Sequence, residues 1–284
     1  MPIEKMDNSQ YTIIPVKTGY IKPNEPFDVI IEKCLNLVEE GDFLVISETP
    51  IAISQGRIVD ESKFEPSFKA YLLADLWSKY VWGYFLGPLL GIKKRTINNL
   101  KKLPKAARYH KQVVLEYYGL KHALKPASEA GIDLSNAPGS YVSLLPCDPQ
   151  GVVEKIARTI EDRTSKKVIS MIIDTDATYE LKGMKFTSLP LAVPGIKCDM
   201  GVYGYLLGRI GKIVGPTVLA VSTTIKTDAA LEIGKIVEDY QKENKNSMET
   251  VYDMENAFNK DVDEITIEML DSIQHTPAVI VRKL

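Results

Sequence analysis

The feature that most constrains this chain is an apolar run that leads directly into three oxygen-bearing side chains. Residues 168–173 read Val-Ile-Ser-Met-Ile-Ile, which is typical of a strand buried in a sheet, and Asp174, Thr175 and Asp176 follow at once. Open α/β sheets bind ligands at the carboxyl ends of their strands. Magnesium and manganese prefer oxygen ligands, and magnesium usually joins one or two carboxylates to substrate phosphates. The pattern therefore favours nucleotide chemistry, with a strand-end turn and an aspartate helix cap as the alternative.

A second acidic segment lies upstream of this run. Residues 130–136 read Ala-Gly-Ile-Asp-Leu-Ser-Asn and place Asp133 and Asn136 three positions apart in a stretch that favours turns. A carboxylate there suits a metal ion, and an amide suits a base or a phosphate. Asp and Asn side chains in turns also commonly satisfy nearby backbone groups, so both interpretations stay open. The functional one requires Asp133 and Asp174 to meet in space.

The rest of the pattern predicts an α/β (α+β) fold. Runs rich in β-branched residues predict strands, and apolar residues three and four apart predict helices. The predicted body comprises residues 1–60 and 127–284, and a helical insertion, broken at Pro88 and Pro104, occupies residues 61–126. We expect strands at 11–16, 42–47, 141–145, 167–174, 185–193, 216–222 and 278–282, helices at 26–39, 151–164, 227–243, 250–259 and 266–273, and a glycine-rich helix or turn at 201–212.

Charge argues against a general affinity for polyanions. The chain has 284 residues, a formal net charge of -2 and a pI near 6.0, so nucleic acid is an unlikely partner unless the contact is local. One local candidate is the segment 93–111, which carries eight lysines and arginines and no acid. Such a run is most often a solvated helix face, and polyanion binding or a partner subunit are the alternatives.

Nothing in the sequence predicts export or a membrane span. The three cysteines share no short metal-binding spacing, and residues 1–10 lack an apolar signal core. Residues 71–92 are very apolar, but Asp75, Lys79 and the Gly-Pro pair at 87–88 interrupt them. We therefore expect a cytoplasmic protein in which residues 71–92 form a buried or interface helix, with a membrane-surface element or a membrane span as the alternatives.

Several strings, taken together and in order, resemble the coenzyme F-420 γ-glutamyl ligase family. The resemblance covers about two-thirds of the chain, chiefly residues 11–58 and 130–222 and the final strand, and the ordered set carries it rather than any single string. The strings are Glu-Gly-Asp-Phe-Leu-Val-Ile at 40–46, Gln-Gly-Arg-Ile at 55–58, the segments 130–136 and 172–175, Leu-Leu-Pro at 144–146 with Asp-Pro at 148–149, Gly-Ile-Lys at 195–197, and Pro-Ala-Val-Ile-Val-Arg at 277–282.

The resemblance implies a metal- and GTP-dependent ligase that forms a γ-glutamyl amide bond. Its acceptor would be a deazaflavin coenzyme F-420 precursor or a related carboxylate, activated as an acyl phosphate before L-glutamate attacks. The family fold, an unusual α/β arrangement with mixed sheets, forms an intertwined homodimer. A non-catalytic descendant that binds a nucleotide, a flavin-like ligand or a protein partner is the alternative.

The resemblance also implies roles for individual residues, although it assigns no catalytic acid or base. Asp133 and Asp174 would ligate Mg²⁺ or Mn²⁺, and Thr175 would assist a second ion. Asn136 and Thr49 would contact the nucleotide. Asp176 and Lys197 are additional candidates.

Two departures from the family pattern concern phosphate binding. The family reads Ser-Lys-Ala-Glu-Gly where this chain reads Ala-Ile-Ser-Gln-Gly at 52–56, so Ile53 replaces a lysine associated with the nucleotide. After Asp-Thr, the family's Asn-Gly-Arg and Arg-Arg-Gly strings are missing. Each lost charge-assisted hydrogen bond is worth about 1.5–3 kcal/mol. The sequence therefore predicts either a different nucleotide or substrate, or substitute cations from the basic run of the helical insertion.

Overall fold

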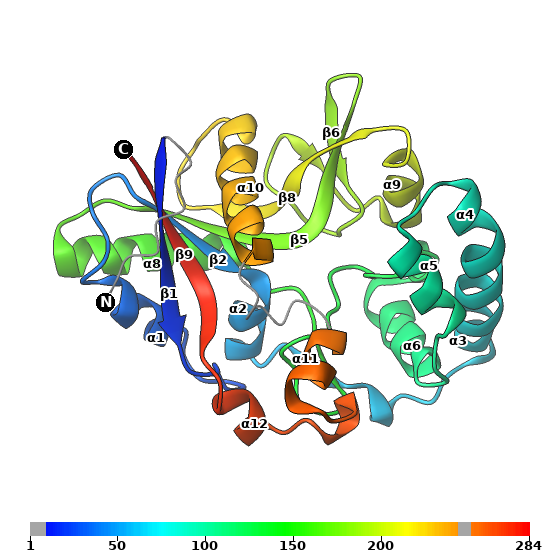
Figure 1. Cartoon of the computed structure of the whole chain (residues 1–284). Coiled ribbons are helices and arrows are strands. Elements are labelled where there is room, and N and C mark those ends of the chain that lie inside the picture. Colours follow the sequence, from blue (N-terminus) through cyan, green and yellow to red (C-terminus); the bar gives the residue numbers. More distant parts are fainter. Residues whose placement is uncertain (1–9, 244–250) are drawn as a thin grey trace. The chain divides into compact units, whose positions relative to one another are not determined.

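The computed structural model describes residues 10–243 and 251–284, and the side chains of all of these except 251–253 (Figure 1). The chain forms two compact units, each described here by itself. Unit 1 comprises Met1–Ile58, Asp133–Thr175 and Gly215–Leu284, and unit 2 comprises Val59–Ile132 and Asp176–Val214. Residues 1–9, and residue 250 at the start of one predicted helix, lie outside the described residues.

Unit 1 is built on a mixed sheet with strand order β1-β9-β2-β5. β1 (Tyr11–Thr18) and β2 (Phe43–Ser47) both pair antiparallel with β9 (His275–Lys283), and β2 pairs parallel with β5 (Ile169–Leu181). β8 (Lys212–Val221) also pairs with β5. Residues 44–46, 171–173 and 278–281 are almost completely buried, which confirms the prediction that these apolar runs are core strands.

Helices cover this sheet because their apolar faces need a partner. α10 (Thr227–Glu243) packs on β2 and β9, whereas α1 (Asp28–Cys34) packs on β1 and on α8 (Pro149–Thr164). The remaining elements of this unit are α2 (Glu48–Ser54), β4 (Tyr141–Ser143), α11 (Val251–Phe258), the short 3₁₀ turn η3 (Val262–Glu264) and α12 (Ile267–Asp271).

The strand that carries the Asp-Thr-Asp cluster does not end where the sequence suggested. We expected it to stop at Asp174, but β5 continues to Leu181 and pairs antiparallel with β6 (Met184–Thr187) from Thr178 onward. Lys182 and Gly183 form the turn with φ of 51° and 80°, the backbone that a tight hairpin requires. The extra length arises because the β-favouring residues after Asp176 find this new partner.

Residues 61–126, the predicted helical insertion, are mainly helical, and unit 2 combines them with the neighbouring residues up to 132 and with residues 176–214. Pro88 lies in the first turn of α4, where a missing N–H costs least, and Pro104 separates α5 from α6, so both prolines mark helix boundaries. The elements of this unit, beginning with β3 at the junction, are β3 (Ile58–Asp60), η1 (Glu61–Lys63), α3 (Phe68–Tyr71), the π-helix η2 (Leu72–Leu86), α4 (Gly87–Leu89), α5 (Lys94–Lys101), α6 (Ala107–Tyr118), α7 (Leu120–Ala123), β6, β7 (Ile196–Lys197) and α9 (Gly201–Leu207).

A lysine lies at the centre of unit 2. Lys111 is 2% exposed, and its ammonium group donates to the carbonyls of Ala123 and Lys125, at 2.8 and 2.7 Å, and to the carboxylate of Glu129. An ammonium group has three donors, so all three are used. Such complete pairing is what a buried charge requires if the desolvation penalty is to be offset.

His110 extends this network on the other side of Glu129. Its Nδ1 lies 2.6 Å from Glu61 and its Nε2 3.5 Å from Glu129. Burial opposes the charged imidazole, but the two carboxylates prevail and raise the pKa of His110 to about 10. Burial likewise opposes the charge on Glu129, but Lys111 and His110 hold its pKa well below the usual value. The cluster is therefore a fully paired ionic network.

No helix in the described part of the chain is both long and apolar enough to cross a lipid bilayer. The apolar segment 71–92 instead forms η2 and α4 with the adjoining residues, and only one side of it is buried.

Candidate functional site

The candidate site follows from the one parallel strand pair of the unit 1 sheet. β2 ends at Ser47, which pairs with Ile173 of β5. Glu48 and Thr49 begin α2 immediately after this point, and Asp174 comes next on β5. The carboxyl edge of parallel strands is where α/β proteins bind ligands. Although β5 continues, its polar cluster therefore begins beside the carboxyl end of its parallel neighbour.

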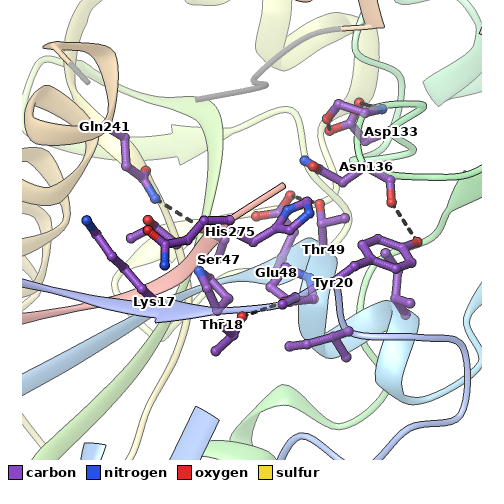
Figure 2. Close-up of a pocket in the computed structure, with 18 of the residues that line it drawn as sticks. Lys17, Thr18, Tyr20, Ser47, Glu48, Thr49, Asp133, Asn136, Gln241 and His275 are labelled. Atoms are coloured by element: carbon purple, nitrogen blue, oxygen red, sulfur yellow. Dashed lines mark hydrogen bonds between the residues drawn. The ribbon is translucent and has the colours of Figure 1, made fainter. Parts of the chain in front are cut away.

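A cavity of about 240 Å³ lies in unit 1. Figure 2 shows its walls, which come from strands β1, β2, β5 and β9, helices α2 and α10, and the loop that carries Asp133. Its volume lies just below the range of about 300–1,000 Å³ that is typical of small-molecule sites. The lining residues used below are Lys17, Tyr20, Ser47, Glu48, Thr49, Ile53, Asp133, Asn136, Thr175, Gln241 and His275.

Asp133 and Asn136 face this cavity from one loop. An isolated antiparallel bridge to Ser143 fixes the backbone of Asp133, and its carboxylate accepts hydrogen bonds from the N–H of Ser135, at 2.9 Å, and from the Ser135 hydroxyl. Asn136 adopts a left-handed backbone with φ of 57°, and its carbonyl accepts a bond from the Tyr20 hydroxyl at 2.9 Å. The loop is a turn that presents both side chains to the cavity.

Thr49 and Glu48 enter the cavity from α2. Both are buried, and the Thr49 hydroxyl donates to the Glu48 carboxylate at 2.8 Å. Figure 2 shows them beside His275 and facing Asn136. This edge of the cavity is thus rich in oxygen atoms, with the predicted nucleotide ligands Thr49 and Asn136 both on its wall.

Only one of Asp174 and Thr175 reaches the cavity, because the side chains of successive strand residues point to opposite faces of a sheet. Thr175 is exposed and lines the cavity, whereas the carboxylate-bearing Asp174 is only 5% exposed and lies outside the cavity wall. Within the part of the chain that the structure describes, no three His, Cys, Asp or Glu side chains group as a metal site. Asp133, Asp174 and Thr175 thus remain a predicted ligand set rather than an observed cage.

The two additional candidates belong to unit 2. Asp176 pairs with the buried ammonium group of Lys125 at 2.6 Å; burial opposes the charge on Lys125, but Asp176 raises its pKa overall. Lys197 is exposed on β7. Asp176 therefore has a structural partner of its own, and neither residue lines the cavity of unit 1.

Three cavity residues, Lys17, Gln241 and Tyr20, had no signal in the sequence. Lys17 on β1 is exposed and is the one lysine or arginine among the described residues that line the cavity. Gln241 on α10 donates to the Ser47 hydroxyl at 3.2 Å. Tyr20 lies against His275 with ring centroids 5.6 Å apart, and burial raises the pKa of its phenol. These residues come from separate segments that only the fold brings together.

His275 matches no triad or zinc-binding spacing with the other histidines of the sequence, yet it lines the cavity. Its Nε2 lies 2.7 Å from the carbonyl of Leu270, and since a carbonyl only accepts, Nε2 carries the hydrogen. Burial lowers the pKa of His275, although the Leu270 carbonyl and Asp271 oppose the shift. The imidazole is therefore neutral near pH 7.

The packing around Ile53 does not suit the lysine that the family has at this position. The Ile53 side chain is 1% exposed and packs with Tyr20, Met254, Ile265 and Leu270 in an apolar cluster beside the cavity. A lysine at this position would leave an ammonium group buried among apolar neighbours, which costs several kcal/mol.

We expect Ile53→Lys to lower the thermal unfolding temperature and not to improve nucleotide affinity. Because ΔΔG of 1 kcal/mol shifts the midpoint of a chain of this size by about 2–4 °C, a loss of at least about 5 °C should be measurable by differential scanning fluorimetry. Ile53→Met keeps the apolar character and should remain within about 3 °C of wild type. An Ile53→Lys protein that is as stable as wild type and binds GTP more tightly would contradict this account.

Comparisons with known proteins identify relatives of this chain. The family model described as F420-0:Gamma-glutamyl ligase matches residues 15–282. An uncharacterized protein of Methanocaldococcus jannaschii is 39% identical over 281 residues, which cover 94% of this chain and 95% of that protein. A coenzyme F420:L-glutamate ligase of Archaeoglobus fulgidus is 27% identical over 75% of this chain and 82% of its own length, and the enzyme of that name in Methanothermobacter thermautotrophicus is 30% identical over 48% of each. The chain belongs to the F420-0:gamma-glutamyl ligase family.

Proposed function

We propose that this protein is an amide-forming ligase that uses GTP and a divalent metal ion to join L-glutamate to a carboxylate acceptor of the deazaflavin coenzyme F-420 type. The observation that carries the proposal is the convergence of Thr49, Asp133, Asn136 and Thr175, from segments distant in sequence, on one cavity at the carboxyl end of β2. Membership of the ligase family supports the reaction class.

The available donors fit a magnesium or manganese ion shared with a phosphate. Mg²⁺ is usually held by one or two carboxylates together with substrate phosphates rather than by an all-protein cage. Asp133 lines the cavity, Asp174 lies next to cavity-lining Thr175 in the chain, and both carry hard oxygen donors. Asp133 and Thr175 would hold the ion from the cavity wall, and when bound it would neutralise charge on the transferring phosphoryl group. Asp174, whose side chain lies outside that wall, belongs to the proposed ligand set through its place in the sequence, and the Asp174→Asn variant tests its part.

The proposed reaction has two steps. An oxygen of the acceptor carboxylate attacks the γ-phosphorus of GTP and releases GDP, which forms an acyl phosphate. The amino group of L-glutamate then attacks the acyl carbon. The bond between that carbon and the phosphate oxygen breaks, phosphate leaves with its electron pair, and the nitrogen loses a proton. Thr49 and Asn136 would orient the nucleotide in the first step, since positioning supplies most of the rate in phosphoryl transfer.

Lys17 is the substitute for the cation lost at residue 53 in this proposal. It lines the same cavity as Ile53 and carries the positive charge that a phosphate requires. Unlike a buried lysine, it keeps its charge at no desolvation cost before the ligand binds, because it is exposed.

Lys17→Met should therefore raise the dissociation constant for GTP by about 10- to 150-fold, the equivalent of one charge-assisted hydrogen bond of about 1.5–3 kcal/mol. Isothermal titration with GTP and magnesium measures this directly. Lys33→Met, which removes an exposed lysine from α1 on the same unit, is the matched control and should bind as wild type does. Equal affinity in the two variants would remove Lys17 from the site.

The function itself is tested by incubating the protein with GTP, magnesium or manganese chloride, L-glutamate and a deazaflavin acceptor. We expect phosphate release that depends on both the acceptor and glutamate, together with a mass increase of one glutamyl residue on the acceptor. GTP binding without any phosphate release would instead favour a non-catalytic family member that binds a nucleotide, a flavin-like ligand or a protein partner. A homodimeric, cytoplasmic enzyme completes the proposal, and analytical ultracentrifugation measures its oligomeric state.

A further inference from the structure

An exposed apolar stripe runs along η2 and α4 in unit 2. Its side chains project into solvent from one side of the segment, and Leu76, Phe85 and Leu89 are 53%, 70% and 80% exposed. Contiguous apolar patches larger than a few hundred Å² are rare on monomeric proteins in water and mark interaction sites. The apolar stripe consists of Leu72, Leu76, Tyr80, Tyr84, Phe85 and Leu89.

The buried side of the same segment carries mostly small residues. Ala74, Ser78, Gly83 and Gly87 are buried, and a side chain at Gly83 would meet Lys101 and Leu100 of α5 at 3.3–3.6 Å. The same face also buries Leu73 and Trp82, and Trp82 packs with Ile92, Leu100 and Val202. The segment therefore carries large apolar residues on both sides, a pattern typical of a helix that is covered all round, although those of the apolar stripe face solvent.

The π-helical geometry of η2 keeps the stripe straight. A π-helix closes i→i+5 hydrogen bonds, so each turn holds between about four and five residues. Side chains four or five positions apart then line up on one face, which is the spacing of the apolar stripe. The buried residues follow the same interval on the other face. The backbone thus displays the stripe as one continuous surface.

Positive charge lies beside the apolar stripe. Residues 67–111 contain ten lysines and arginines against a single acid, Asp75, in a chain whose net charge is -2. Arg108 neutralises that acid at 2.6 Å. α5 packs against η2, and its Lys101 lies 4.7 Å above the ring of Tyr84. The basic flank consists of Lys93, Lys94, Arg95, Lys101, Lys102 and Lys105.

We propose that the apolar stripe and the basic flank together bind the surface of an anionic lipid bilayer. Leucine and aromatic side chains enter the boundary between headgroups and acyl chains, while lysine and arginine attract the negatively charged headgroups. The chain associates with one face of the bilayer and does not cross it. This surface belongs to unit 2 and is separate from the cavity of unit 1, so it goes beyond the ligase reaction.

Charge complementarity favours a bilayer over two other occupants. A second copy of the chain, docked about a two-fold axis, would present the same patch to itself, and the two basic flanks would repel each other. A nucleic acid would match the charge but would leave Leu76, Phe85 and Leu89 without an apolar partner. An anionic membrane matches both features at once.

Vesicle flotation with the full chain tests the proposal. We expect the protein to float with vesicles of equal parts phosphatidylglycerol and phosphatidylcholine and not with phosphatidylcholine alone. Raising the ionic strength from about 0.01 to 1 M shortens the screening length from about 30 to about 3 Å and should release it. Leu76→Ser with Phe85→Ser should weaken binding at least about tenfold, and Lys94→Glu with Lys102→Glu by a similar factor or more.

Ile210→Ser is the matched control, since Ile210 is 71% exposed on unit 2 but lies outside the apolar stripe. It should float as wild type does, and circular dichroism should show that all variants are folded. Two results would overturn the proposal. One is a stripe variant that binds anionic vesicles as tightly as the control; the other is a wild-type protein that never floats but whose dimer, measured by light scattering, is lost on Leu76→Ser with Phe85→Ser.

Discussion

Replacing Asp174 by Asn should reduce phosphate release from GTP by about 10²- to 10⁴-fold. The substitution keeps the size of the side chain and removes its charge, and a metal ion in a phosphoryl-transfer site contributes several kcal/mol to the barrier. Asp174 is 5% exposed, so a charge at this position is little screened by water. Initial rates at saturating magnesium, acceptor and glutamate measure the loss.

Two companion variants make this result specific. Asp162→Asn removes a charge from the exposed side of α8 and should leave the rate unchanged. Asp133→Asn should resemble Asp174→Asn, because both carboxylates belong to the same proposed ligand set, and losses at two residues that act as one unit should not add. If thermal unfolding shows that the Asp174→Asn protein is folded, and the protein releases phosphate at the wild-type rate, the assignment of this carboxylate to the metal fails.

Replacing Lys111 by Met should destabilise unit 2 by about 3–5 kcal/mol. Removal of one partner of a buried ion pair leaves the other charge uncompensated, and here Glu129 is 4% exposed and would lose its closest cation. Two backbone carbonyls would lose their donor as well. The expected loss is a large fraction of the stability of an ordinary domain.

Both tryptophans of the chain, Trp77 and Trp82, lie in unit 2, so urea unfolding followed by tryptophan fluorescence reports on this unit. Lys105→Met, an exposed substitution, is the control and should change the midpoint little. Adding Glu129→Gln to Lys111→Met should recover part of the lost stability, because the orphaned charge disappears. A Lys111→Met protein as stable as the control would show that the network contributes nothing to folding.

The sequence anticipated most elements of unit 1 because their apolar patterns are local. The runs at 43–47, 169–173 and 278–281 are continuous and can only be buried. The prediction that this strand ends at Asp174 was wrong for a non-local reason: the residues after Asp174 remain a strand because β6 returns to pair with β5. A strand's length depends on its partners, and partners are not visible in the pattern of one segment.

Part of the candidate site could also be predicted from local sequence patterns. Asp133, Asn136 and Thr175 carry oxygen donors within recognisable strings, and Thr49 lies between two such strings; all four line one cavity. Lys17 is a single basic residue in an ordinary edge strand, and only the fold shows that it faces that cavity. The shape of η2 was equally hidden, since the sequence indicated a helix but not a π-helix with large apolar residues on its exposed side as well.

The chain passes between the two units at four points, and two of these fall on candidate ligands. Asp133 is the first residue after one passage, and Thr175 is the last residue before another. An insertion or deletion at either junction would therefore shift an oxygen donor of the cavity, even when the altered loop belongs to unit 2. Transplanting unit 2 between relatives would be tolerated only where both junctions keep their length and backbone path.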